Sequence, residues 1–144
     1  MALVTSCTSG VGSNFLDVDE GGDLVQYKFA AAKFNQSGKP VRFTGKCKSA
    51  CTVLLSVKNK CTAPDTGFYF HAARTQRDGQ EIFSQVGTDV LMNSYPPQVQ
   101  NHIVRKGGLK MDEWIIIDGR QMIAWGVMPE CQFTRSRSNS GDTG

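Results

Sequence analysis

The sequence predicts a single α/β domain in which strands and helices alternate along the chain. Short β-rich runs, such as residues 41–44 and 67–71, flank segments whose apolar residues recur at spacings of three and four, as in residues 23–34. With 144 residues and 40% hydrophobic content, the chain can bury one core but is too short for two comfortable domains. Such alternation favours a mixed sheet with parallel pairings, in which turns at the carboxyl ends of strands build the site.

The first part of the chain is expected to contain a strand, a tight turn and a helix. Residues 1–13 are rich in Ser, Thr and Gly without periodicity and predict a flexible or extended arm, so the domain is expected at 14–131. A strand at 14–18 and its glycine turn precede the helix at 23–34, which residues 36–40 terminate.

The same order is expected to repeat in the next part. After a strand at 41–44, Gly45 opens a turn that leads into a buried helix at 49–57. A loop at 58–60 follows, and the β-rich run at 67–71 predicts a strand with a histidine at its carboxyl end. The Phe and Tyr side chains of this run are expected in the core rather than in a substrate groove.

The remainder of the chain is expected to be mainly helical. Pro96 and Pro97 divide its helical pattern, because proline lacks the backbone donor and constrains the residue before it. Trp114 and Trp125 are expected to be packing anchors. The expected elements are a surface loop at 74–79, helices at 87–94 and 96–105, a strand at 114–117, a helix at 120–125 and a disordered tail at 132–144.

Charge and hydropathy limit the classes of partner. The formal charge of +3 comes from 16 Lys and Arg against 13 Asp and Glu that are scattered along the chain, which disfavours a nucleic-acid partner. No apolar run approaches the roughly 20 residues that span a bilayer, so no transmembrane segment is expected. We also expect no cofactor and no metal.

The cysteine usage predicts disulfides. Five cysteines are many for an intracellular protein of this size, and the candidates within the expected domain are Cys47, Cys51, Cys61 and Cys131. Cys51 with Cys61 is the first expected bridge, because the helix and the following strand bring them near each other. The alternative is a Cys₃His zinc site that includes His71, and it is disfavoured because the ligand spacings are looser than those of a zinc knuckle.

The start of the chain allows two interpretations of Cys7. Val4-Thr5-Ser6-Cys7 resembles the end of a bacterial lipoprotein signal, although the charged and apolar regions of a signal peptide are missing. The other interpretation is a stray cysteine in a loose arm. A periplasmic or otherwise exported location is expected from the overall cysteine usage.

Three turns carry the parts that acyl hydrolysis by serine needs, namely a nucleophile, a base and backbone donors for the oxyanion. Ser49 lies where a strand-end loop enters an apolar helix, so orphan amides and the helix dipole point towards it, and small Ala50 lets a substrate approach. His71 is a suitable base because its unperturbed pKa lies near neutrality. Gly21-Gly22 can bring bare amides close to a carbonyl.

Each of these features alone has a structural explanation, because a serine before an apolar helix is usually an N-cap and a strand-end histidine is usually structural. Their order and spacing form a more specific pattern. It consists of Glu20-Gly21-Gly22, residues 45–52, and Cys61-Thr62-Ala63-Pro64 followed by residues 67–71. These segments resemble, in that order, the glycine-rich turn, the nucleophile segment and the catalytic-histidine strand of the Clp protease proteolytic subunit.

Further motifs extend this resemblance over nearly all of residues 14–131. They are Gly-x-Cys-x-Ser-Ala-Cys-Thr at 45–52, Cys-x-x-Pro at 61–64, Phe-His-Ala at 70–72, Tyr95-Pro96, Gly107-Gly108-Leu109 and Pro129-x-Cys131. With them the chain is most similar to small bacterial, often exported Clp-protease-like proteins of unknown substrate.

The resemblance implies a ββα-spiral domain of the ClpP/crotonase type, truncated at its N-terminus. Glu20 stands where the family has a proline, which places a carboxylate beside the glycine turn. Glu113 is a second candidate for the acidic triad member, for which Asp112 is favoured. The implied site residues are Ser49, His71 and Asp112 as the catalytic triad, and Gly21, Gly22 and Ala50 as the oxyanion hole.

The predicted function is therefore that of a peptidase-type serine hydrolase acting on a peptide or protein substrate. The alternative is a catalytically silent structural or protein-binding module of the same fold, in which Ser49 caps a helix and His71 is a satisfied strand-end residue. Because the N-terminal part is shorter than in Clp subunits, a tetradecamer is not expected, whereas a smaller homo-oligomer or a larger assembly stays open.

Overall fold

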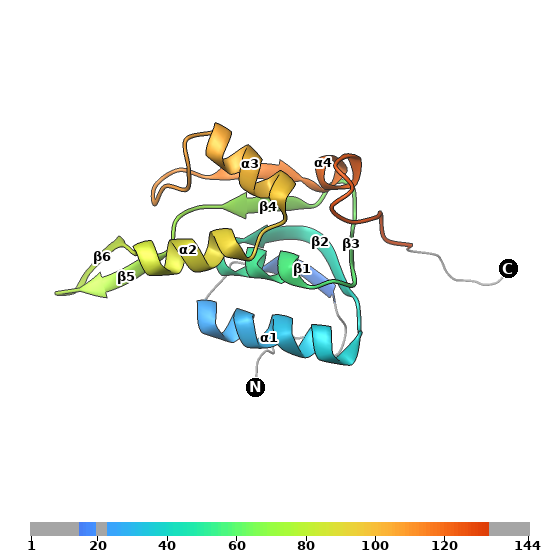
Figure 1. The fold of residues 1–144 in the computed structure, drawn as a ribbon, viewed down its shortest axis with the longest axis horizontal. Coiled ribbons are helices and arrows are strands. Elements are labelled where there is room, and N and C mark those ends of the chain that lie inside the picture. The colour runs from blue at the N-terminus through green and yellow to red at the C-terminus, as the bar shows by residue number, and fades with distance from the viewer. Residues whose placement is uncertain (1–14, 20–22, 133–144) are drawn as a thin grey trace, which may run out of the picture.

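The chain folds as a mixed sheet with several helices, which confirms the expected α/β class (Figure 1). The computed structural model describes residues 15–19 and 23–132, so the predicted arm at 1–13, the glycine turn and the tail beyond 132 lie outside it. In chain order the elements are β1 (Phe15–Asp19), α1 (Leu24–Ser37), β2 (Val41–Lys48), the 3-10 helix η2 (Ser49–Ser56), β3 (Lys60–Thr62), β4 (Gly67–Phe70), β5 (Arg74–Arg77), β6 (Gln80–Phe83), α2 (Gln85–Asn93), α3 (Pro97–Arg105), β7 (Ile115–Asp118) and α4 (Gly119–Ala124).

β2 connects the sheet because its two halves pair with different strands. The sheet order is β1-β2-β4-β7, and β3 also pairs with β2. Residues 41–43 of β2 pair in parallel with β3, and residues 46–48 pair in parallel with β4. β1 is parallel to β2, whereas β7 is antiparallel to β4. The carboxyl ends of β1, β2 and β4 therefore meet at one edge, where sheets of this kind build their sites.

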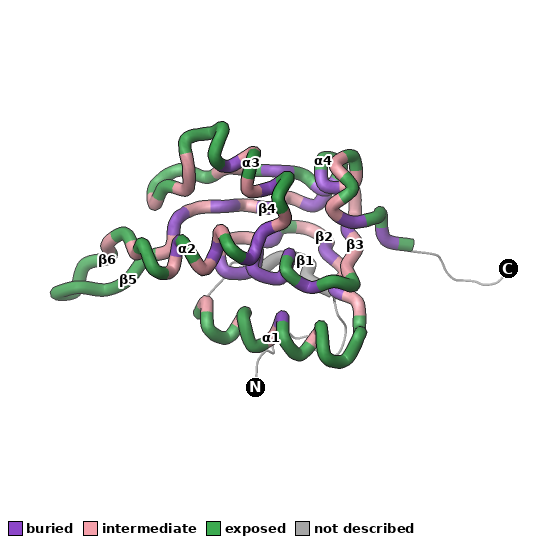
Figure 2. The backbone as a smooth tube through the Cα atoms, viewed as in Figure 1, coloured by how far each residue is buried: buried purple, intermediate pink, exposed green. Residues whose placement is uncertain are grey.

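One face of the sheet is buried under η2. Phe43, Phe68 and Phe70 are fully buried in the core, and the rings of Phe43 and Phe68 meet edge to face with centroids 5.1 Å apart. η2 contacts β2 and β4, and α1 and α2 contact η2 in turn, so η2 forms an inner layer (Figure 2). This position explains its apolar sequence. Tyr69, which was expected in the core with its neighbours, lies half-buried on the opposite face.

A β-hairpin stands where a surface loop is expected at 74–79. Arg77 pairs with Gln80, so Asp78-Gly79 forms a two-residue turn between β5 and β6. Their φ angles of 52° and 79° are positive, as a type I′ turn requires, and Asp-Gly is a favoured sequence for that turn. The loop prediction is wrong because nearly all side chains of the two strands are exposed, so they lack the apolar alternation that identifies a half-buried strand.

β2 is also longer than expected. Gly45 lies inside this strand with a φ of 68°, instead of opening a turn after residue 44. The register between β1 and β2 shifts by one residue at this point, so Gly45 accommodates a bulge. The extension brings the end of β2 to Lys48, immediately before Ser49.

Two disulfides join described residues, and the expected Cys51–Cys61 bridge is wrong. Cys47 is bonded to Cys51 and Cys61 to Cys131, with Cα atoms 5.5 and 4.8 Å apart. The pairing differs because β3 lies beside the C-terminal segment, where the Cys131 amide donates to the Thr62 carbonyl over 3.0 Å. Since these four cysteines are bonded, their thiolates are not available as zinc ligands.

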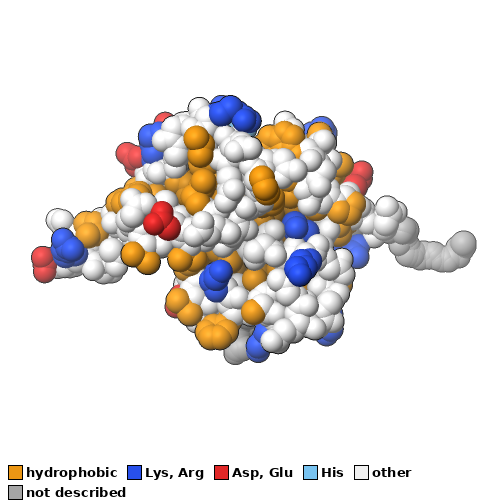
Figure 3. Space-filling model, viewed as in Figure 1, with side chains coloured by type: hydrophobic (Ala, Val, Ile, Leu, Met, Phe, Trp, Pro, Cys, Tyr) orange, Lys and Arg blue, Asp and Glu red, His pale blue; other side chains and the backbone are white. Residues whose placement is uncertain are grey.

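Basic side chains are scattered over the surface. On the face shown in Figure 3, Lys and Arg side chains lie over several elements and form no continuous stripe. None of the helices in the described ranges is long and apolar enough to cross a bilayer.

Removing the Cys61–Cys131 bridge is expected to destabilise the protein more than removing the Cys47–Cys51 bridge. The sequence separations are 70 and 4, so the chain-entropy model gives losses of about 4 and about 2 kcal/mol in the free energy of unfolding. Urea unfolding of C61A/C131A and C47A/C51A measures both losses. A larger loss from the short loop would contradict this account.

Candidate active site

Ser49 and His71 lie at the carboxyl ends of two neighbouring parallel strands. Lys48 is the register partner of Tyr69, and Ser49 follows the last residue of β2 as His71 follows the last residue of β4. Because paired strands lie about 4.8 Å apart, the structure brings both residues to one edge of the sheet. No hydrogen bond joins their side chains within the described ranges, and catalytic hydrogen bonds often tighten only when substrate binds.

The backbone of Ser49 is strained. Its φ is 57°, a left-handed conformation that is uncommon for residues other than glycine and costs on the order of 1–3 kcal/mol. The N-cap of η2 is Lys48, and its side chain makes no capping hydrogen bond. Ser49 follows the N-cap residue and is therefore not the helix cap that the structural alternative requires. A serine on a sharp strand-to-helix turn is the arrangement that exposes the nucleophile in α/β-hydrolases.

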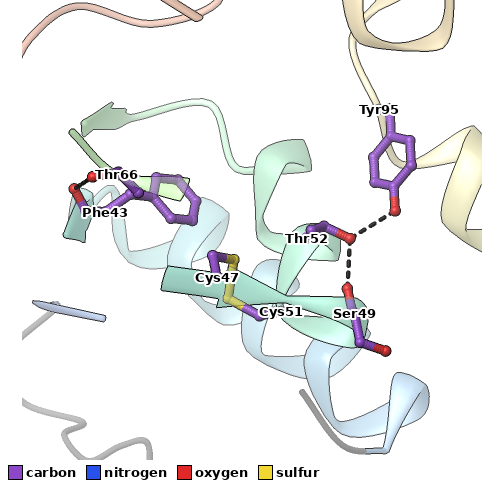
Figure 4. Close-up of a disulfide and its surroundings, with 7 residues drawn as sticks. All are labelled: Phe43, Cys47, Ser49, Cys51, Thr52, Thr66 and Tyr95. Atoms are coloured by element: carbon purple, nitrogen blue, oxygen red, sulfur yellow. Dashed lines mark hydrogen bonds between the residues drawn. A yellow bond between two sulfur atoms is a disulfide. The ribbon is translucent and has the colours of Figure 1, made fainter. Parts of the chain in front are cut away.

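Two connections hold the Ser49 turn in place (Figure 4). The Cys47–Cys51 disulfide spans the turn, and both cysteines are fully buried. The Thr52 hydroxyl donates to the Ser49 carbonyl over 2.6 Å and lies 2.6 Å from the Tyr95 hydroxyl. Because Thr52 has one proton to donate, Tyr95 is the donor to Thr52. Burial raises the pKa of the Tyr95 phenol, which keeps that proton in place. Sequence reasoning gave no role to Thr52.

His71 is placed to act as a base. Its Nδ1 lies 2.8 Å from the Ala72 carbonyl oxygen, so Nδ1–H donates there and Nε2 carries the lone pair. The Trp114 ring packs against the imidazole with centroids 4.2 Å apart and planes tilted by 34°. Burial is the main cause that lowers the pKa of His71, against the raising effect of the Ala72 hydrogen bond, and it keeps the ring neutral at pH 7.

The expected acidic triad members lie in the loop before β7. Asp112 is exposed, and no hydrogen bond or ion pair of its carboxylate is found among the described residues. Glu113 pairs instead with Lys110 over 3.9 Å. The structure thus gives His71 Nδ1 a backbone carbonyl as its direct partner, and the role of Asp112 stays a prediction.

The expected oxyanion donors are only partly described. Ala50 follows Ser49 and is buried, with 4% of its surface exposed. Gly21 and Gly22 lie outside the described residues. β1 ends at Asp19, opposite Cys47, so the chain leaves β1 at the edge of the sheet where Ser49 lies.

No group of three or more His, Cys, Asp or Glu side chains in the described ranges is placed to hold a metal ion. No protein-family model matches the chain, and a comparison with curated proteins finds no match. The functional assignment therefore depends on the geometry of the site.

Thr52→Val is expected to destabilise the protein more than Tyr95→Phe. The valine would leave the buried Tyr95 hydroxyl and the Ser49 carbonyl without this partner, at a cost of about 1–3 kcal/mol, whereas the phenylalanine removes a single hydrogen bond worth about 1 kcal/mol. Urea unfolding of both variants and of T52V/Y95F measures the losses. Strictly additive losses would show that the two hydroxyls are not coupled.

Proposed function

We propose that this protein is a serine hydrolase of the peptidase type, with Ser49 as nucleophile and His71 as base. The observation that carries the proposal is the left-handed backbone of Ser49, whose φ is 57° at the end of β2. Strain at a non-glycine residue persists only where the surroundings enforce it, and such residues cluster at functional sites. The neighbouring strand β4 is followed directly by His71, whose Nε2 carries the lone pair that can accept a proton.

The reaction follows from these two side chains. His71 Nε2 accepts the Ser49 hydroxyl proton while Oγ attacks a peptide or ester carbonyl, and the amides of Gly22 and Ala50 bind the oxyanion. The imidazolium gives its proton to the leaving group, and water then hydrolyses the acyl-enzyme with His71 again as the base. The Ala72 carbonyl holds Nδ1–H throughout and orients the ring.

We also propose a specific fold family and a cellular location. Parallel pairing of β1, β2 and β4 with η2 against them supports a ClpP/crotonase-like ββα spiral. The two disulfides fit an oxidising compartment, which supports export to the periplasm or beyond.

A silent module of the same fold is the second candidate. It is favoured by one observation: within the described ranges no hydrogen bond or ion pair joins His71 to a carboxylate, whereas an acidic partner stabilises the imidazolium in serine hydrolases.

Labelling with a fluorophosphonate tests the hydrolase directly. The wild type is expected to incorporate one label, because the reagent reports a nucleophilic serine with a working base. S49A is expected to incorporate none. S56A is the matched control, because Ser56 ends the same helix and is exposed, and it should label as the wild type does. Labelling of the wild type no greater than that of S49A would overturn the proposal in favour of the silent module.

The pH dependence of the labelling rate is expected to follow the protonation of His71. Its pKa lies below the ordinary value of 6.5, so the ring is mostly neutral at pH 6.5 and the rate should level off as pH rises further. As pH falls through the lowered pKa, protonation removes the base and the rate should fall. H71Q should lose this activity, whereas H102Q, which changes the only other histidine, should keep the wild-type profile. An unchanged profile in H71Q would exclude His71 as the base.

A further inference from the structure

The exposed face of the sheet carries a cluster of lysine and aromatic side chains next to the proposed catalytic pair. We call it the lysine–aromatic patch, and its members are Lys46, Lys48, Tyr69 and Trp114. Lys46 pairs with Gly67 and Lys48 with Tyr69 across β2 and β4, so these side chains lie side by side. The Nζ atoms of Lys46 and Lys48 lie 5.8 and 5.3 Å from the centre of the Tyr69 ring.

Gly67 lets the Tyr69 ring lie along the strand. A Cβ atom at position 67 would lie 2.8 Å from Tyr69 Cε1, closer than real contacts allow. The ring thus covers Gly67, and both ammonium groups lie over the ring, where a cation is attracted to it. The patch consequently holds two lysine ammonium groups beside one aromatic ring.

Trp114 connects the patch to His71. Its ring meets Tyr69 edge to face at 5.7 Å and packs on His71 at 4.2 Å. Trp114 remains 42% exposed and the neighbouring Ile116 is 56% exposed, so Trp114 is not the core anchor that the sequence predicts, whereas Trp125 does pack against the core. An apolar wall therefore leads from the lysines to the proposed base.

Two acidic groups of the described residues on and beside β7 already have partners. The Asp118 carboxylate accepts from the Gln121 amide over 2.8 Å and lies 3.9 Å from Arg120. Glu113 pairs with Lys110. Lys46 is exposed and has no ion pair within the part of the chain that the structure describes. The positive charge of Lys46 is thus available to a ligand.

We propose, on the basis of the hydrolase function above, that the lysine–aromatic patch binds an acidic side chain of a peptide substrate beside the scissile bond. Charge complementarity selects the ligand, because a carboxylate over the patch meets the Lys46 ammonium while the peptide's apolar atoms lie on Tyr69 and Trp114. Lys48 immediately precedes Ser49, so a carboxylate bound here belongs to a residue close to the attacked carbonyl. A single-stranded nucleic acid would use the same groups, but only a peptide accounts for their position next to Ser49 and His71.

The first test uses two peptidyl phosphonates that differ only by Glu or Gln next to the reactive residue. Wild-type Ser49 is expected to react with the Glu probe about fivefold faster, the upper range for an exposed ion pair. The preference should decline at about 1 M salt, where the screening length falls to about 3 Å. K46Q should reduce the ratio of the Glu-probe rate to the Gln-probe rate towards one, and K46E should make the Gln probe react faster. K33Q is the matched control, because Lys33 is exposed on α1 and lies away from the patch in sequence and in the fold.

The second test does not depend on catalysis. The chain has two tryptophans, so W125F leaves Trp114 as the only tryptophan, which is excited selectively at wavelengths where tyrosine does not absorb. Unreactive Glu and Gln versions of the same peptide are titrated into W125F and into W125F/K46Q. The Glu peptide should change Trp114 emission with an affinity about fivefold higher than the Gln peptide in W125F alone.

The two tests separate the two proposals. Labelling without any preference for the Glu probe would overturn the acidic-substrate proposal while the hydrolase stands. No labelling, together with selective binding of the Glu peptide at Trp114, would overturn the hydrolase and keep the acidic-peptide site. Stronger binding of an oligonucleotide than of the Glu peptide at Trp114 would assign the patch to nucleic acid and overturn the proposal.

Discussion

β2 pairs with β3 through its first residues and with β4 through its last, and the geometry of the site depends on this change of partner. Parallel pairing aligns carboxyl ends, so the register of Lys48 with Tyr69 brings Ser49 and His71 to one edge. The antiparallel pairing of β4 with β7 sets Phe70 opposite Ile115, and Trp114 consequently lies beside His71. If β4 slipped by one residue against its neighbours, its outward side chains would point inward. The catalytic pair and the lysine–aromatic patch would then no longer form.

The strained turn at Ser49 is stable because its surroundings are rigid and buried. The Cys47–Cys51 disulfide joins the end of β2 to η2, and Thr52 bonds the Ser49 carbonyl from within the same helix. Tyr95 extends this support to the junction between α2 and α3, and its ring also packs edge to face on Phe70 with centroids 5.1 Å apart. The strand that carries His71 and the helix that carries Ser49 therefore share one support.

Local patterns were sufficient for most elements and insufficient for long-range pairings. The helices α1, α2, α3 and α4 overlap the segments in which helices were predicted. The spacing of apolar residues along the sequence is enough to predict an amphipathic helix. The β5–β6 hairpin was not predicted, because nearly all of its side chains are exposed and its sequence lacks an apolar alternation. The predicted disulfide pairing was wrong because the actual pairing depends on β3 lying beside residues 129–131. This contact joins segments that are about half the chain apart.

The sequence by itself determined the α/β class, the positions of Ser49 and His71 at the ends of strands, and the presence of cysteines for disulfides, since these follow from periodicity, propensity and composition. Only the tertiary structure decided the left-handed backbone of Ser49, the Ala72 carbonyl as the partner of His71, and the exposure of Trp114. These three depend on which strands become neighbours. Strand neighbours are chosen by the free energy of the whole packed sheet and not by any local segment.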